Sequence, residues 1–108
     1  MYYFSSTLIY YILGGPYKIV CYFGGWSIYR KDPMRFGPKD IDPGMCTHLI
    51  YSFAGLDNQT LEIVSLDPFA DIDEGGYRNV IALKEKNPDL KVMLAVGGWV
   101  EGVEKYSK

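Results

Sequence analysis

Three short apolar runs, each followed by glycine, organise the hydrophobic pattern of this chain. They cover residues 18–23, 47–54 and 91–96, and Gly24, Gly55 and Gly97 follow them directly. Four to eight consecutive apolar residues bounded by turn residues are typical of a strand buried on both faces, as in a parallel sheet. The pattern therefore predicts three buried strands, each of which leaves the core at a glycine.

The residues between the first two runs, and those just after the second, predict short connections. Residues 27–37 are polar and of mixed charge, which favours a surface loop, and residues 38–43 predict one turn of helix that Pro43 keeps short. Residues 61–64 are β-prone and follow the turn residues Asp57 and Asn58, which favours a small additional hairpin.

The last connection predicts a longer helix. Carboxylates within residues 71–74 stand at its start, where the helix dipole favours negative charge, and Asn87 and Pro88 end it. Apolar spacing places four residues on its packed side: Tyr77, Val80, Ile81 and Leu83. Three cationic residues are then expected to point outward: Arg78, Lys84 and Lys86.

Strands that alternate with helical connections predict an α/β fold with parallel strands and right-handed crossovers. Three strands do not close a sheet, and so little helix leaves one apolar face uncovered. We therefore interpret the chain as a partial (β/α)8 TIM barrel, incomplete, made of the first three parallel strands with their connections. A complete barrel of this type needs about 250 residues.

Tryptophan follows two of the three predicted strand ends. Trp26 comes after Gly24 and Gly25, and Trp99 comes after Gly97 and Gly98. Ligands of α/β folds bind at the carboxyl ends of the strands, so the two indole rings are candidates for a flat binding surface on one rim of the sheet. The alternative is a pair of core tryptophans that follow ordinary turns.

Composition narrows the classes of function. The chain has 108 residues, of which 48% are hydrophobic, and its net charge of −2 comes without any basic cluster. This balance argues against nucleic acid and against an anionic membrane surface as partners. The single histidine, His48, has no metal-spaced ligands beside it and is interpreted as a structural strand residue. We expect no metal and no organic cofactor.

Two further signals concern the compartment. Cys21 and Cys46 are the only cysteines, an even number that is weak evidence for a disulfide on its own. Asn58 begins the glycosylation sequence Asn-Gln-Thr. Together these features favour an oxidising, secretory compartment, and we expect a secreted, extracellular protein.

The first sixteen residues differ from the rest. Residues 1–14 are apolar and aromatic without any charge, and Gly14, Gly15 and Pro16 separate them from the first strand. The segment lacks the basic start of a signal peptide and is too short for a membrane span. We interpret residues 1–16 as a leader or unrelated tail and residues 17–108 as one domain portion.

Three segments stand out together: residues 17–23 (YKIVCYF), 42–55 (DPGMCTHLIYSFAG) and 94–99 (LAVGGW). In this order and at this spacing they resemble the first three strands of glycoside hydrolase family 18 chitinases, most closely those secreted by animals, notably arthropods. The resemblance extends over residues 17–108, which it identifies as the N-terminal part of a family 18 catalytic domain.

The resemblance implies a TIM-type barrel, a disulfide between Cys21 and Cys46, and a groove that binds chitin or chito-oligosaccharides. In family terms Tyr22 and Phe53 line the floor around the reacting sugar. Gly98 and Trp99 correspond to positions where a backbone amide and an indole meet the substrate. Trp26 corresponds to an aromatic residue on the non-reducing side of the groove. For Tyr22 and Phe53 the alternative is ordinary filling of the barrel interior.

The chemistry implied by the resemblance is retaining, substrate-assisted hydrolysis, in which the acetamide oxygen of the sugar attacks the anomeric carbon. Its acid and its orienting aspartate lie in a DxxDxDxE motif at the end of the fourth strand, which this sequence lacks. The pairs Asp40/Asp42 and Asp71/Asp73 do not follow an apolar strand. We therefore assign no catalytic residue and expect this chain to be inactive alone, as part of a secreted chitinase that degrades chitin.

Two other interpretations remain open at the level of sequence. A chitinase-like lectin would keep the groove and bind chito-oligosaccharides without hydrolysis, and the residues of this chain do not separate it from a chitinase. A stand-alone interaction module would need a partner to cover its strand edges and its apolar helix face.

Overall fold

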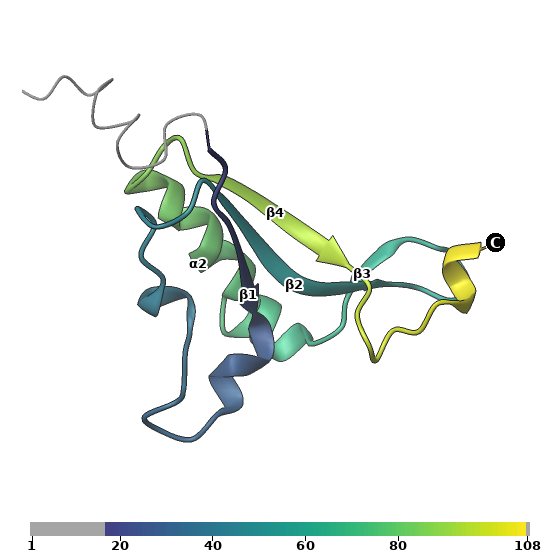
Figure 1. The fold of residues 1–108 in the computed structure, drawn as a ribbon. Helices are drawn as coiled ribbons and strands as arrows, with labels where there is room; N and C mark the ends of the chain where they lie inside the picture. The colour runs from purple at the N-terminus through teal and green to yellow at the C-terminus, as the bar shows by residue number, and fades with distance from the viewer. Residues whose placement is uncertain (1–16, 108) are drawn as a thin grey trace, which may run out of the picture.

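The computed structural model describes residues 17–107, which form a four-stranded sheet with helical segments against one face (Figure 1). Strands β1 (Val20–Gly24) and β4 (Lys91–Val96) both pair in parallel with the central strand β2 (His48–Leu56). A short strand, β3 (Ile63–Ser65), pairs antiparallel with the end of β2. The predicted α/β fold with three parallel strands is confirmed, and the predicted small hairpin is β2–β3.

The connections are mostly single helical turns. The first two, Gly25–Tyr29 and Pro38–Asp40, are 3-10 helices between β1 and β2. A π-helical turn, Phe69–Asp73, precedes α2 (Gly76–Ala82), which continues into the 3-10 turn Leu83–Glu85. A last 3-10 helix, Glu104–Ser107, follows β4. No helix within residues 17–107 is long and apolar enough to cross a membrane.

The core lies between the sheet and α2. Its buried side chains come from β1, from β2 and the residues before it, from the α2 segment, and from the residue before β4; they are Phe23, Cys46, Leu49, Tyr51, Val80, Leu83 and Leu90. A disulfide joins Cys21 of β1 to Cys46, just before β2, with 6.0 Å between the two Cα atoms. Adjacent parallel strands are therefore linked covalently at the amino-terminal edge of the sheet.

Two details of the predicted connections are wrong. Residues 27–37 are not wholly a surface loop, because the chain first turns through the helix Gly25–Tyr29, which buries Ser27 and lets its Oγ donate to the Phe36 carbonyl at 2.6 Å. Ile81 is 58% exposed and not on the packed side of the helix. The segment tightens into a 3-10 turn after Ala82, where residues three apart align, so Val80 and Leu83 take the packed face and Ile81 lies beside it.

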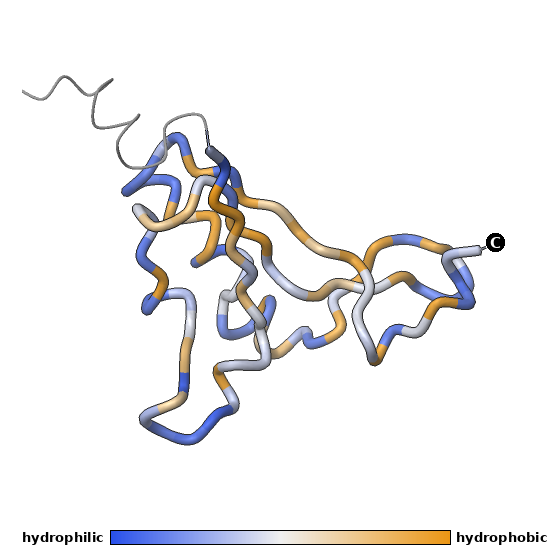
Figure 2. Tube along the Cα trace, viewed as in Figure 1, coloured by the Kyte–Doolittle hydropathy of each residue, from blue (hydrophilic) through white to orange (hydrophobic). Residues whose placement is uncertain are grey.

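Strands β1 and β4 are not buried on both faces as their apolar runs predict. In β1, Val20 and Tyr22 are 49% and 66% exposed. In β4, Met93, Leu94 and Val96 are 49%, 42% and 37% exposed. The reason is topological: β4 pairs with β2 only, so its other edge is free within the described chain. Figure 2 shows β4 as a largely apolar strand at the margin of the sheet. An apolar run thus identified the strand, while its burial depends on neighbours that residues 17–107 do not include.

Strand β2 also extends one residue beyond Gly55, the residue expected to close it. Residues Ala54, Gly55 and Leu56 pair with Ser65, Val64 and Ile63 of β3, and this pairing keeps the chain extended. The predicted leader, residues 1–16, lies outside the described residues.

Candidate functional site

The carboxyl ends of the three parallel strands surround a cavity of about 380 Å³. Trp26 after β1, Phe53 of β2, and Gly98 and Trp99 after β4 all line it. Four of the five predicted binding residues, from three separate segments, therefore share one cavity. The walls are mainly apolar, and polar groups come from Ser52, Asp67 and Asp71.

The aromatic rings at this cavity present flat faces. The rings of Trp26 and Phe53 stack with centroids 5.9 Å apart and planes 10° from parallel. Trp26 is 51% exposed and Trp99 is 99% exposed, so neither indole belongs to the core. The interpretation of the two residues as core tryptophans is therefore wrong.

Gly98 fits closely against the floor of the site. Its φ is +100°, and a Cβ atom added there would lie 3.0 Å from the ring of Phe53. A side chain at this position is unfavourable for both backbone and steric reasons. Glycine thus lets the backbone after β4 approach the ring of Phe53, which forms the floor of the site. The Ser52–Phe53 peptide bond is cis.

Tyr22 lies beside this cavity and does not line it. It is 66% exposed and borders a neighbouring hollow that it shares with Trp26 and Phe53. The alternation of a strand explains its direction: Phe23 points into the core under the helices, so Tyr22 points to the opposite face. All five predicted residues therefore belong to one continuous surface around Trp26 and Phe53.

A buried carboxyl group, Asp71, supports the wall of the cavity. It is 3% exposed, and it accepts hydrogen bonds from the hydroxyls of Tyr51 (2.6 Å), Ser65 (2.5 Å) and Tyr77 (3.1 Å). Burial, followed by the bond to Asp71, raises the pKa of Tyr51 well above its usual value. The hydroxyl of Tyr51 therefore stays protonated and donates, which ties β2 to the turn that precedes α2.

A second carboxyl group, Asp67, lies nearer the surface of the same wall. Its Oδ2 accepts a hydrogen bond of 2.6 Å from the hydroxyl of Tyr29, and its Oδ1 accepts one of 3.1 Å from the amide of Ala70. The bond to Asp67 is the main reason that the pKa of Tyr29 is raised to about 12. Asp67 thus joins the segment after β1 to the turn before α2.

The remaining candidate residues have local roles. Asp40 and Asp42 accept from the amides of Gly37 and Gly44, each at 2.8 Å, so this pair shapes turns. His48 lies within 2.8 Å of the hydroxyl of Thr47 through Nδ1. Among residues 17–107 no group of three His, Cys, Asp or Glu side chains is placed to hold a metal ion.

Asn58 is exposed in the turn between β2 and β3. The carboxyl group of Asp57 shapes this turn by accepting from the amides of Gln59 and Thr60, both at 2.8 Å. Glycosylation of Asn58 stays a prediction.

The sequence did not indicate Asp67 or Glu101 near the site, and it placed Asp71 only at the start of a helix. Glu101, just after Trp99, pairs with Lys105 at 2.6 Å and is described further below. The spacing of four residues between Glu101 and Lys105 is a recognisable ion-pair signal. No comparable signal exists for Asp71, whose hydroxyl partners come from three separate places in the sequence.

Comparisons with known proteins give a consistent result. The model of the family described as glycosyl hydrolases family 18 matches residues 18–108. The endochitinase of Manduca sexta is 47% identical over 90 residues, which are 83% of this chain and 16% of that protein. Chitotriosidase-1 of Mus musculus is 46% identical over 101 residues, which are 94% of this chain and 21% of that protein. The chain thus spans about a fifth of these relatives or less.

Solved structures of chitinases and of a chitinase-like protein have the same arrangement. The group IV chitinase of Ostrinia furnacalis superimposes with a TM-score of 0.78 at 46% identity, over 83% of this chain and 24% of that one. It has also been solved in complex with allosamidin. Human YKL-39, described as a pseudo-chitinase with retained chitooligosaccharide binding properties, superimposes with a TM-score of 0.70 at 41% identity, over 83% of this chain and 23% of that one.

Proposed function

The chain belongs to glycosyl hydrolase family 18, and on that premise we propose that residues 17–108 supply one part of a groove that binds chains of β-1,4-linked N-acetylglucosamine. The observation that carries the proposal is the meeting of Trp26, Phe53 and Trp99 around one cavity at the carboxyl ends of parallel strands. Relatives described as chitinases and as a chito-oligosaccharide-binding protein support chitin binding or hydrolysis in general.

The chemistry of these side chains suits such a ligand. Pyranose rings have apolar C–H faces that pack against aromatic rings, and hydroxyl and acetamide groups at their rims that need polar partners. The exposed rings of Trp26 and Trp99 offer two stacking faces. Phe53 forms the floor between them, and Tyr22 extends the same surface beside Trp26. The close backbone approach at Gly98 brings an amide to the sugar.

The finer proposal is hydrolysis by a retaining, substrate-assisted mechanism. A glutamic acid protonates the glycosidic oxygen, and the acetamide oxygen of the bound sugar attacks its anomeric carbon while the glycosidic C–O bond breaks and the leaving sugar departs as an alcohol. Water then attacks the anomeric carbon of the resulting oxazolinium ring and returns a proton to the glutamate, which gives net retention. The acidic motif for these steps is not in the printed sequence. The residues described here therefore bind and orient the sugar, and the proton donor comes from a part of the fold that they do not contain. This segment alone is expected to have no hydrolytic activity.

Secretion belongs to the same proposal. The disulfide between Cys21 and Cys46 and the exposed glycosylation sequence at Asn58 suit an extracellular protein.

Binding without hydrolysis is a second candidate function, because a structural relative is described as a pseudo-chitinase that retains chitooligosaccharide binding. Both functions use the same aromatic surface, so the residues in this chain serve either. The difference lies in a single glutamic acid of the acidic motif: a protein that carries it hydrolyses chitin, and one that lacks it only binds.

A chimera tests the proposal in a complete barrel. Residues 18–108 replace the matched segment of the Manduca sexta endochitinase, and binding and cleavage of chitopentaose are measured. We expect the chimera to bind and cleave it, because the acid is supplied by the recipient protein. Trp26→Ala and Trp99→Ala in the chimera are expected to weaken binding. A folded chimera that binds no chitopentaose contradicts the proposal.

A further inference from the structure

The side chain of Trp99 has almost no packing contacts to hold it in place. Trp99 and Val100 are 99% and 91% exposed, so their side chains gain almost nothing from packing. Three glycines flank them, Gly97, Gly98 and Gly102, all with positive φ. A segment with little packing and so much backbone freedom needs anchors elsewhere if the indole is to keep one position.

Two anchors fix this segment, and both are on β2. On the strand side, the amide of Gly97 donates to the carbonyl of Ala54 at 3.0 Å. On the far side, the carboxylate of Glu101 accepts the amide of Leu56 at 2.8 Å. The Trp99 segment is therefore a loop whose two ends are attached two residues apart on the same strand.

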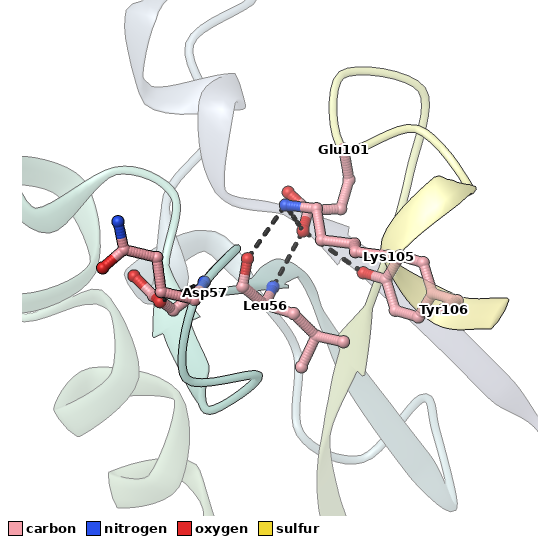
Figure 3. Close-up of polar contacts among 6 residues, drawn as sticks. Leu56, Asp57, Glu101, Lys105 and Tyr106 are labelled. Atoms are coloured by element: carbon pink, nitrogen blue, oxygen red, sulfur yellow. Dashed lines mark hydrogen bonds and ion pairs between the residues drawn. The ribbon is translucent and has the colours of Figure 1, made fainter. Parts of the chain in front are cut away.

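Glu101 does not act alone at the second anchor. Lys105 pairs with its carboxylate at 2.6 Å and donates to the carbonyl of Leu56 at 2.9 Å, while the hydroxyl of Tyr106 approaches the carboxylate at 3.4 Å (Figure 3). Pairing between β2 and β4 ends at Ala54 and Val96. Glu101 and Lys105 thus satisfy the amide and the carbonyl of Leu56 at the edge of β2 that β4 no longer covers.

The fold leaves room for this carboxylate. A Cβ atom added at Gly55 would lie 2.5 Å from Oε2 of Glu101, so the lack of a side chain at Gly55 leaves space for the carboxylate of Glu101. The side chain of Glu101 is only 4% exposed and that of Lys105 is 16% exposed. A carboxylate so well covered and so fully paired is a fixed part of the structure, whereas most surface ion pairs are loosely held.

We propose that Glu101 is a positioning residue that holds the indole of Trp99 at the groove, acting through its attachment to Leu56 with the help of Lys105. Glu101 does not line the cavity that Trp99 shares with Phe53. Its effect on ligand binding therefore passes through Trp99. This inference rests on the proposed function only for the ligand that Trp99 meets, and the loop geometry itself is independent of any ligand.

The test measures loop order and ligand affinity separately in the 108-residue chain labelled with 15N. The heteronuclear NOE of the Trp99 amide reports its motion on the picosecond-to-nanosecond timescale. We expect Glu101→Ala to lower this NOE and to leave that of Trp26 unchanged. Glu104→Ala, which removes an exposed glutamate three residues along, is the matched control and is expected to change neither.

Affinity for chitotetraose supplies the second readout. Glu101→Ala is expected to raise the dissociation constant about fivefold or more, and to have no further effect once Trp99→Ala is present, since two residues that act through one contact are not additive. Glu101→Gln, which keeps the acceptor for Leu56 but loses the charge, is expected to lie between wild type and Glu101→Ala.

Two results would overturn the positioning role of Glu101. An unchanged NOE at Trp99 in Glu101→Ala overturns it, as does a loss of affinity that is equally large in the Trp99→Ala background. If Glu101→Ala does not fold, Glu101→Gln and Lys105→Met decide by the same two criteria. If Trp99→Ala leaves the affinity unchanged while Glu101→Ala still lowers the NOE, the positioning role stands and the proposed sugar contact of Trp99 fails.

Discussion

At Trp99 the indole ring has solvent on nearly every side, which is costly for so large an apolar group unless a ligand covers it. The two candidate stacking residues differ in this respect. Trp26 already stacks on Phe53 and is half covered before any ligand arrives. Of the two, Trp99 therefore has more area to bury on binding, and its truncation should cost more.

Trp99→Ala is expected to weaken chito-oligosaccharide binding by roughly 1–3 kcal/mol, the range for removing a buried aromatic contact at a binding site. Isothermal titration with chitotetraose measures it. Met34→Ala is the control, because Met34 is an exposed apolar residue that does not line the cavity. Equal affinities for wild type and Trp99→Ala would remove Trp99 from the site.

The sequence indicated Trp26, Phe53, Gly98 and Trp99 because the glycine–tryptophan strand ends and the family resemblance mark them directly. It did not indicate Asp71 or Glu101. Their importance comes from partners that are 20 and 45 residues away in the chain, namely the hydroxyl of Tyr51 and the amide of Leu56. Long-range polar contacts of this kind leave no periodic pattern in a single sequence.

At the scale of elements, the disulfide joins β1 to the start of β2 across 25 positions of the chain. Closing a loop of about this length stabilises the fold by roughly 3.5 kcal/mol in the chain-entropy model. Cys46→Ser is expected to lower the free energy of unfolding by an amount of this order, measured by urea denaturation. The chitotetraose contacts should remain, because the bond lies at the opposite edge of the sheet from the cavity. Unchanged stability would contradict a structural role for the disulfide.

The bond between Tyr51 and Asp71 connects β2 to the turn before α2. Tyr51 is 3% exposed and donates to Asp71 at 2.6 Å. Tyr51→Phe is expected to cost about 1.5–3 kcal/mol of unfolding free energy, the range for a hydrogen bond to a carboxylate. Tyr29→Phe, at an exposed tyrosine that also bonds a carboxyl group, is the matched control and should change stability much less. Similar costs for the two variants would contradict the role assigned to burial.

The anchor at Glu101 predicts a dependence on pH. The ion pair with Lys105 and the amide of Leu56 hold the pKa of Glu101 below its usual value of 4.5. A carboxyl group whose pKa is lowered by folding contributes its stability above the unfolded pKa and loses it as pH falls through the folded one. The difference in unfolding free energy between wild type and Glu101→Gln should therefore be constant near neutral pH and shrink below pH 4.5.

Denaturation curves at a series of pH values test this dependence. Asp57, whose pKa is also lowered, mainly by the amides of Thr60 and Gln59, titrates in both proteins and cancels from the difference. A difference that stays constant down to acid unfolding would show that Glu101 contributes no charge-dependent stability.

The strands were predictable because each is an apolar run that ends near a glycine, and the helix was predictable from its apolar spacing. The end of β2 and the direction of Ile81 depend instead on neighbouring segments. Strand β3 extends β2 past Gly55, and the tightening after Ala82 turns Ile81 outward. Neither effect is visible in the periodicity of the element itself.

For the whole molecule, the sequence predicted a partial barrel, and the sheet order β1–β2–β4 with parallel pairing agrees with it. The chain covers 24% of the Ostrinia furnacalis structure it matches. This partial coverage explains why the apolar residues of β4 are exposed, because the neighbours that would bury them are not among residues 17–107. The aromatic rim, by contrast, is formed within the chain, so its binding can be examined directly.

The most direct test of that rim uses the two tryptophans of the chain as reporters. A 15N-labelled chain has two indole N–H signals, assigned with Trp26→Phe and Trp99→Phe, and these are followed during titration with chitotetraose and, separately, maltotetraose. We expect both signals to shift with chitotetraose along one common binding curve and neither to shift with maltotetraose. Indole signals that do not move at saturating chitotetraose, in a chain whose spectrum shows it folded, would contradict a binding surface formed by Trp26 and Trp99.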